Sequence, residues 1–167
     1  MVSEADHRAA CDVLYREALY LDTREWDKWI DLFHEDAVFW VPTWKDDGSA
    51  TNDPYGELSL IYCNSREQLQ ERVSRAGGGR SIASLPPMRT AHTVSNVMVE
   101  EGEGGTLRVR SVGVSHVFTL KRREQNVFFS LQTHDLARDS AGAWRIRQKK
   151  MLLQNDYIPR MIDFYTI

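Results

Sequence analysis

The residues of this chain that could exchange protons at neutral pH are its histidines, some of which have carboxylates close by. The histidines are His7, His34, His92, His116 and His134. His34 and Asp36 stand where a helix-like pattern gives way to a strand-like one, and His92 opens a later strand-like segment. If these three side chains converge at the mouth of a pocket, they form a general acid–base group suited to an isomerase or a dehydratase.

A structural interpretation of the same residues is simpler. His-Glu-Asp between a helix and a strand is a good turn, in which His34 caps carbonyl groups at the helix C-terminus and Asp36 bonds its own backbone. His116 and His134 share strand-like segments with apolar neighbours, which is typical of satisfied sheet residues. Position alone therefore predicts no catalytic residue in this chain.

Sequence signatures of metal sites and nucleophiles are missing. There is no Cys-x-His followed by Cys-x-x-His for a Rieske cluster, no pair of histidines one helical turn apart, and no two-histidine, one-carboxylate spacing for non-haem iron. There is no Gly-x-Ser-x-Gly elbow, and Cys63 has no His and acid in its sequence context. The glycines at 77–79 follow a helix instead of opening one, so they predict its end rather than a phosphate loop. We expect no catalytic, cofactor-binding or metal-binding residue here.

Composition and charge limit the class of protein. The 167 residues are 42% hydrophobic and 27% charged, with a formal net charge of −3, which fits one globular domain and predicts neither nucleic acid nor a membrane as partner. The basic clusters at 121–123 and 145–150 read as solvated faces or as partners for carboxylates across an interface. With only Cys11 and Cys63, and no signal or membrane-spanning segment, a reducing cytoplasm is the expected location.

The N-terminal residues predict two helices that lead into a strand. Ser3 and Asp6 give a start signal for a first helix to about residue 21. Asp22 and Glu25 suggest a second start, and apolar residues at 26, 29, 30 and 33 recur with helical spacing. The continuous apolar run at 37–41, closed by Pro42, predicts a strand covered on both faces.

The middle of the chain predicts a polar excursion, a strand and a third helix. Residues 43–53 are turn-rich, and Trp44 within them either tucks back onto the fold or anchors a subunit interface. Residues 58–62 alternate as a strand, and Ser65 with Gln68 caps a helix over 65–76. Pro86 and Pro87 keep the following loop extended, as an arm toward a neighbour would be.

The second half predicts an antiparallel meander over 90–155. Its longest strand, 106–121, changes apolar phase near Ser111, which suggests a bulge where a curved sheet bends. Strands this long must twist and curl around the helices, so we expect an α+β fold with a cone-shaped, strongly curved antiparallel sheet packed on N-terminal helices. The apolar tail 156–167 predicts docking on this subunit or another. In this scheme residues 1–167 form a single domain, with helices at 3–33, strand and loop at 37–62, helix at 65–76, then meander and tail.

Several segments, taken in their order and spacing, are specific enough to indicate a protein family. They read Leu-Tyr-Arg-Glu-Ala-x-Tyr-Leu-Asp-x-Arg-Glu-Trp-Asp-Lys-Trp at 14–29, Phe-Trp-x-Pro-x-Trp-x-Asp-Asp-Gly at 39–48, Glu-x-Ser-Leu-Ile-Tyr at 57–62 and Arg-Thr-x-His-x-Val-Ser-Asn-Val at 89–97. Together they closely resemble the small (β) subunit of aromatic-ring-hydroxylating dioxygenases, in particular the benzoate, toluate, anthranilate and halobenzoate group. One departure is Gly-Gly-Gly-Arg-Ser-Ile at 77–82, where benzoate members are expected to continue a charged helix.

The resemblance implies a fold of the nuclear-transport-factor-2 (cystatin-like) type and a structural role. Such a subunit forms a trimeric base in an assembly of three large and three small subunits. The large subunit would hold the Rieske [2Fe–2S] cluster and the mononuclear Fe(II), and a separate reductase would deliver electrons from NAD(P)H for cis-dihydroxylation of an aromatic carboxylate with O2. The self-contained isomerase or dehydratase is the alternative. The residues we expect at interfaces are Trp44, Tyr55, Arg89, Tyr157 and Arg160.

Overall fold

The computed structural model describes residues 1–77, 87–158 and 162–167. Helix α1 spans Glu4–Thr23, and the Ser3 hydroxyl caps it by accepting a hydrogen bond from the backbone N–H of Asp6 at 3.0 Å. It ends at Arg24, whose left-handed backbone (φ 57°) directs its N–H to the Leu21 carbonyl. The predicted start of this helix is confirmed, and its apolar stripe is buried.

The second helix differs from the prediction at both of its ends. Helix α2 spans only Trp26–Ile30, and its N-cap residue, Glu25, makes no side-chain capping bond. Asp22 is not a cap, because it belongs to the last turn of α1. Its carboxylate instead accepts from the backbone N–H of His92, in a distant strand. Phe33 already belongs to β1. The apolar stripe is nevertheless buried as expected, since Trp29 and Phe33 lie 4.7 Å apart between ring centroids.

A single six-stranded sheet has the order β2-β1-β6-β5-β4-β3. The elements after α2 are β1 (Phe33–Pro42), β2 (Ser59–Cys63), α3 (Arg66–Gly77), β3 (Arg89–Glu101), the 3₁₀ turn η2 (Glu103–Gly105), β4 (Leu107–Thr119), β5 (Glu124–Arg138) and β6 (Trp144–Leu153). β3 to β6 form the predicted antiparallel meander, and β1 joins it by pairing parallel to β6. Because β1 and β6 are far apart in sequence, local patterns gave no sign of this parallel pair.

Helix α3 begins as its sequence predicts. Ser65 Oγ accepts from the backbone N–H of Gln68 at 3.3 Å, while the Gln68 side chain accepts from the N–H of Asn64 at 3.0 Å. The helix ends at Gly77, and the glycines at 78–79, the segment to Ile82 and Pro86 lie outside the described residues. The proposed arm of residues 80–89 is therefore described only from Pro87 onward.

The irregularity expected near Ser111 is in the neighbouring strand. β4 pairs with β5 in unbroken register from Leu107 to Thr119, so the predicted bulge in β4 is wrong. The register shift lies in β3, between Ser95 and Met98, opposite Ser111, and Asn96 there takes a left-handed backbone (φ 53°). In β4 the odd-numbered residues face the core and the even-numbered ones lie on the outer face of the sheet. The apolar residues at even positions are therefore outer-face residues and do not indicate a change of register.

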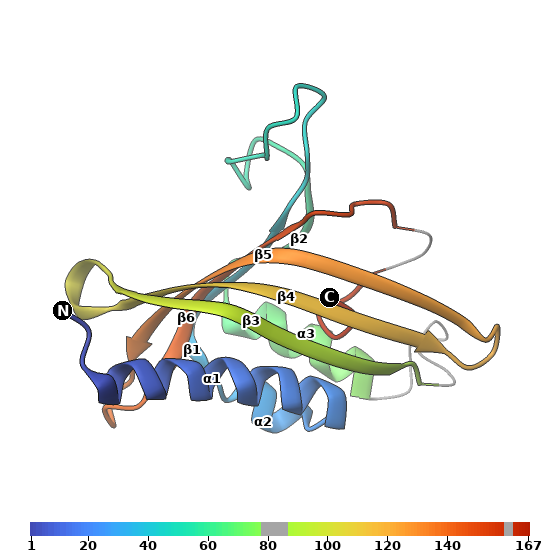
Figure 1. Cartoon of the computed structure of the whole chain (residues 1–167). Coiled ribbons are helices and arrows are strands. Elements are labelled where there is room, and N and C mark those ends of the chain that lie inside the picture. The colour runs from blue at the N-terminus through green and yellow to red at the C-terminus, as the bar shows by residue number, and fades with distance from the viewer. Residues whose placement is uncertain (78–86, 159–161) are drawn as a thin grey trace.

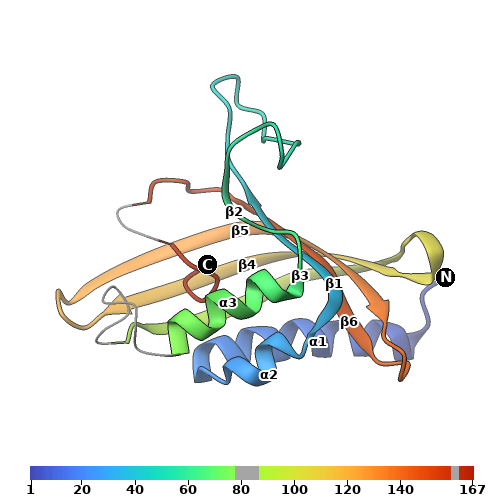
Figure 2. The same cartoon turned by 180° about the vertical axis from the view of Figure 1, so that it is seen from behind.

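All three helices lie on the concave side of the sheet and enclose the core (Figures 1 and 2). The chain end closes this core, with Phe164 1% exposed and its ring 4.7 Å from that of Trp29. The predicted α+β cone with N-terminal helices on a curved sheet is confirmed. Within the described ranges, no helix is both long and apolar enough to cross a membrane.

Candidate functional site

The structure does not bring His34, Asp36 and His92 together. His34 and Asp36 lie on β1, where the His34 Nδ1 accepts from the Asp36 backbone N–H at 3.3 Å and stands 4.0 Å from its carboxylate. Asp36 is exposed, and His92 lines a cavity inside the cone to which neither β1 residue contributes. The acid–base trio that the alternative reading required is therefore not formed. The capping role for His34 is also wrong, because α2 ends at Ile30, before the strand that holds His34.

His92 instead pairs with Asp22, a residue that the sequence reading placed in a helix cap. One Asp22 oxygen lies 2.6 Å from the His92 Nδ1 and 2.9 Å from the Thr90 hydroxyl, and the other accepts from the His92 backbone N–H at 2.8 Å. Burial would raise the pKa of Asp22, but the hydrogen bonds from His92 and Thr90 outweigh it and lower the pKa below its usual value. The carboxylate therefore fastens the end of α1 to the start of β3 and orients the imidazole.

A second buried polar cluster joins α1 to the far strands of the meander. Glu17 accepts from the Lys149 ammonium at 2.7 Å and from the His134 Nε2 at 3.1 Å, and all three residues are buried. Burial alone would raise the pKa of Glu17, but the Lys149 charge and the bonds from both partners lower it to about 2. Burial lowers the pKa of His134, so this imidazole is neutral and donates through Nε2.

Sequence reasoning missed this cluster because it placed Lys149 on a solvated face. The alternation of Arg145, Arg147 and Lys149 suggests one outward row. The register between β5 and β6 shifts between Asp135 and Leu136, so the inward positions of β6 change from Ile146 to Lys149. The available signal was Glu17 itself, a carboxylate on the otherwise apolar face of α1 that needs a buried partner.

The outer face of the sheet carries an exposed apolar strip, which we define as Val127, Phe129 and Leu131 of β5. These side chains are 38%, 44% and 53% exposed. Phe129 pairs with Val114 of β4, and Leu131 lies between Val112 of β4 and Leu152 of β6, so partly buried apolar residues flank the strip. Exposed apolar side chains grouped in this way make the strip a candidate for contact with another subunit.

The segment 43–58 projects from the sheet as an arm beyond β1 and β2 (Figure 1). Its order comes from polar contacts: Lys45 and the backbone N–H groups of Asn52 and Asp53 bond the Glu57 carboxylate and lower its pKa to about 2. Trp44 tucks back onto the fold, since its indole N–H donates to the Leu153 carbonyl at 2.6 Å.

The other interface candidates lie at separate places on the surface. Tyr55, on the arm, is 80% exposed and packs edge-on against Tyr62, while Tyr157, in the segment after β6, is 82% exposed. Arg89 is exposed at the start of β3. Arg160 lies outside the described residues.

The described residues fit neither a Rieske cluster nor a mononuclear iron centre, the two centres that the resemblance places in the large subunit. Among them, no group of three or more His, Cys, Asp or Glu side chains is arranged to hold a metal ion. In the buried cluster around Glu17, the carboxylate is already bonded to Lys149 and His134, so it has no need of a metal ion. Residues 1–77, 87–158 and 162–167 therefore show neither the thiolate and imidazole set of a Rieske cluster nor a facial iron triad.

These features define a cone-shaped α+β subunit whose apolar core holds two buried polar clusters and whose sheet has an apolar strip on its outer face. The family model described as "Ring hydroxylating beta subunit" matches residues 16–160. The toluate 1,2-dioxygenase subunit beta of Pseudomonas putida is 36% identical over 162 residues, which cover 96% of this chain and 98% of that protein. The chain belongs to the β subunits of ring-hydroxylating dioxygenases, and is thus part of an enzyme complex.

Further relatives agree in sequence and in structure. The benzoate 1,2-dioxygenase subunit beta of Acinetobacter baylyi is 38% identical over 155 residues, covering 92% of this chain and 89% of that one. The crystal structure of the benzoate 1,2-dioxygenase beta subunit from Burkholderia mallei superimposes with a TM-score of 0.77 at 34% identity, covering 100% of this chain and 99% of that chain. The resemblance found in the sequence is confirmed.

Proposed function

We propose that this chain is the non-catalytic, structural subunit of a dioxygenase that cis-dihydroxylates an aromatic carboxylate. The observation that carries this proposal is family membership over nearly the whole chain, together with benzoate- and toluate-dioxygenase relatives. The geometry supports it, because the described residues offer no metal-binding cluster, while an apolar strip and an ordered arm are free to contact other subunits.

The reaction itself would take place in a partner. In this proposal a large oxygenase subunit holds the Rieske [2Fe–2S] cluster and the mononuclear Fe(II), and a reductase supplies electrons from NAD(P)H for the reaction with O2. The small subunits form a trimer within an α3β3 assembly, so each buries surface against its own copies and against large subunits. The free thiols of Cys11 and Cys63 support a reducing, cytoplasmic location.

We assign the contacts of this assembly to two surfaces. One is the apolar strip of β5, which association would remove from water. The other is the arm with Tyr55, together with Arg89 and Tyr157 as exposed aromatic and cationic anchors of the kind that interfaces use. Trp44 supports the arm from within, and Arg160 completes the set of candidates proposed from the sequence.

Co-expression with the large subunit tests the proposal. The two chains should co-purify in a 1:1 ratio, with a mass by native mass spectrometry that matches three copies of each. This chain expressed alone should be colourless and free of iron, whereas the complex should show the absorption of a Rieske cluster. Stoichiometric iron in the isolated chain, or failure of the two chains to associate, would contradict the assignment.

A further inference from the structure

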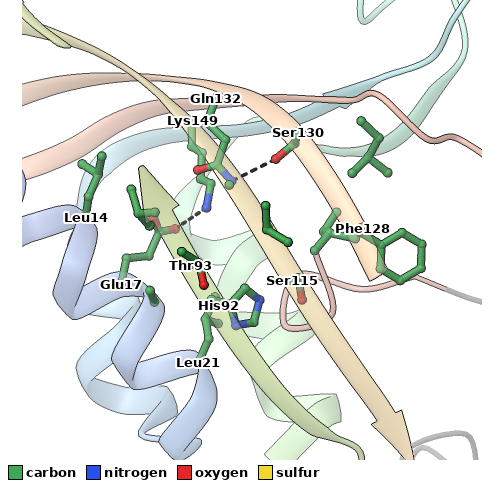
Figure 3. A pocket seen from close by; sticks show the side chains of 16 residues that line it. Leu14, Glu17, Leu21, His92, Thr93, Ser115, Phe128, Ser130, Gln132 and Lys149 are labelled. Carbon is green, nitrogen blue, oxygen red and sulfur yellow. Dashed lines mark hydrogen bonds and ion pairs between the residues drawn. The ribbon is translucent and has the colours of Figure 1, made fainter. Parts of the chain in front are cut away.

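A space of about 20 Å³ lies inside the cone, between α1 and the inner face of the sheet (Figure 3). Leu21 and Phe128 are among its apolar lining residues, and His92 and Ser115 are among the polar ones. A buried space of about 10–15 Å³ is large enough for one water molecule, whereas small-molecule pockets start at about 300 Å³. The interior of the cone therefore matches one water molecule and not an organic ligand.

His92 has an unused hydrogen-bonding nitrogen beside this space. Its side chain is 9% exposed, and its Nδ1 lies 2.6 Å from the Asp22 carboxylate. An ionised carboxylate only accepts hydrogen bonds, so Nδ1 carries the proton, and in the neutral imidazole Nε2 is an acceptor. Within the described part of the chain, this buried Nε2 has no hydrogen-bond partner. Because a buried acceptor without a donor is costly, a donor is expected to reach it.

Ser115 lines the same space from the neighbouring strand, but its hydroxyl is not the missing donor. It stands directly opposite His92 in the pairing of β3 with β4, and it is 2% exposed. A hydroxyl carries one proton, and Ser115 donates its proton to the Thr166 carbonyl at 3.0 Å. Its oxygen can still accept a hydrogen bond. Two acceptors on adjacent strands thus border the space, and a molecule with two protons would satisfy both.

The other polar side chains around the space bond one another. The Lys149 ammonium donates to Glu17 at 2.7 Å (Figure 3). The Gln132 amide donates to the Ser130 hydroxyl at 3.0 Å. A charged ligand would lose its hydration in this buried space, where the ammonium and the carboxylate already neutralise each other. An uncharged donor of the size of water is the occupant that these surroundings favour.

We propose that one buried water molecule occupies this space and donates hydrogen bonds to the Nε2 of His92 and to the Oγ of Ser115. The water completes a chain of hydrogen bonds that begins at Asp22, passes through both of these side chains and ends at the Thr166 carbonyl. This chain joins α1, β3, β4 and the C-terminal segment, so the docking of residues 162–167 is coupled to the end of α1. The water is part of the fold, and Asp22 is the positioning residue that holds the proton on Nδ1.

A crystal structure of the full chain, at a resolution that shows ordered waters, tests the proposal directly. It should show one water within about 3.2 Å of both the His92 Nε2 and the Ser115 Oγ. An empty space in an otherwise well-ordered interior, or a water bonded to neither atom, would overturn the proposal.

A methyl group placed beside the space distinguishes a bound water from an empty void. Ser115→Thr keeps a hydroxyl for the Thr166 carbonyl and adds one methyl group, which is close in size to a water molecule. If the methyl group displaces the water, the Nε2 of His92 loses its donor, so the equilibrium constant for unfolding in urea should rise at least about fivefold. An unchanged or lower constant, as expected when a methyl group fills an empty void, would contradict the proposal.

His92→Asn provides the matched background for this test. Its side-chain amide can still donate to Asp22, but it offers no acceptor at the position of Nε2. In this background Ser115→Thr should not raise the unfolding constant, because residue 92 no longer has an acceptor that the water must satisfy. An equal rise in both backgrounds would rule out the bond between the water and His92. If His92→Asn does not fold, the crystal structure of the unaltered chain decides.

Discussion

Glu17 of α1 and Lys149 of β6 stand 132 positions apart in the sequence, yet their side chains meet at 2.7 Å with each only 4% exposed. His134 of β5 completes the cluster by bonding the other Glu17 oxygen. The three residues therefore tie the first helix to the last two strands of the sheet. Each charge in this cluster is tolerated only because its partner is present.

Removing one member of the pair should be costly. Lys149→Met leaves a buried carboxylate without its cation, so the free energy of unfolding should fall by about 3–5 kcal/mol in urea denaturation. Arg147→Met, which also replaces a basic residue by Met but at an exposed position of the same strand, should cost less than about 0.5 kcal/mol. Adding Glu17→Gln to Lys149→Met should restore part of the loss. A loss below about 1 kcal/mol for Lys149→Met alone would mean that the pair contributes little.

The same cluster predicts how stability depends on pH. Burial holds the pKa of His134 in the folded chain below its ordinary value of 6.5, so the unfolded chain binds more protons and stability falls as the pH drops below about 6.5. The pKa of Glu17 is lowered from 4.5 to about 2, so its contribution is present above pH 4.5 and is lost as the pH falls toward 2.

Urea denaturation between pH 8 and pH 3 measures this dependence. His134→Gln keeps a donor for Glu17 but does not titrate, so the loss of stability between pH 7 and pH 5 should be smaller in this variant. His116→Gln, at an exposed position, serves as the control and should behave like the unaltered chain. An identical pH profile for His134→Gln would exclude His134 as the group that titrates.

A charge placed in the apolar strip should disrupt assembly with the other subunits while leaving the fold of this chain intact. Leu131→Asp places a charge on a surface that association would bury, so binding to the other subunits should weaken by at least about 2 kcal/mol, or roughly 30-fold. Size-exclusion chromatography of the co-expressed subunits measures this effect. Leu19→Asp, at a comparably exposed apolar position on α1, should assemble normally. Intact assembly of Leu131→Asp would remove the strip from the interface.

The fold could largely be predicted because its elements carry local signals. Neighbouring residues determine the helix caps at Ser3 and Ser65 and the turns of the meander. All of these are present in the structure. The failures arose where a tertiary contact overrides the local pattern. Asp22 has the sequence of a cap, but its carboxylate bonds β3, and the left-handed Arg24 decides where α1 ends.

The buried clusters could not be predicted because they depend on register. The apolar residues of β4 at even and odd positions were read as one face with a slip, whereas they belong to two faces that are both apolar. The bulge in β3 and the shift in β6 are set by pairing with a neighbouring strand, and a single sequence does not record that pairing. Lys149 was therefore assigned to a solvated face, whereas it is buried.

His34 provides the last test, because it was the residue most suggestive of catalysis. In the structure it lies on β1, where its Nδ1 accepts from the backbone N–H of Asp36, outside the cavity that holds His92. His34→Ala should therefore leave ring hydroxylation by the assembled enzyme within severalfold of normal, because no acid–base partner is lost. Product formation per complex is the measurement, with the amount of complex determined by chromatography. A loss of about 10³ or more in the intact complex would instead give His34 a catalytic role.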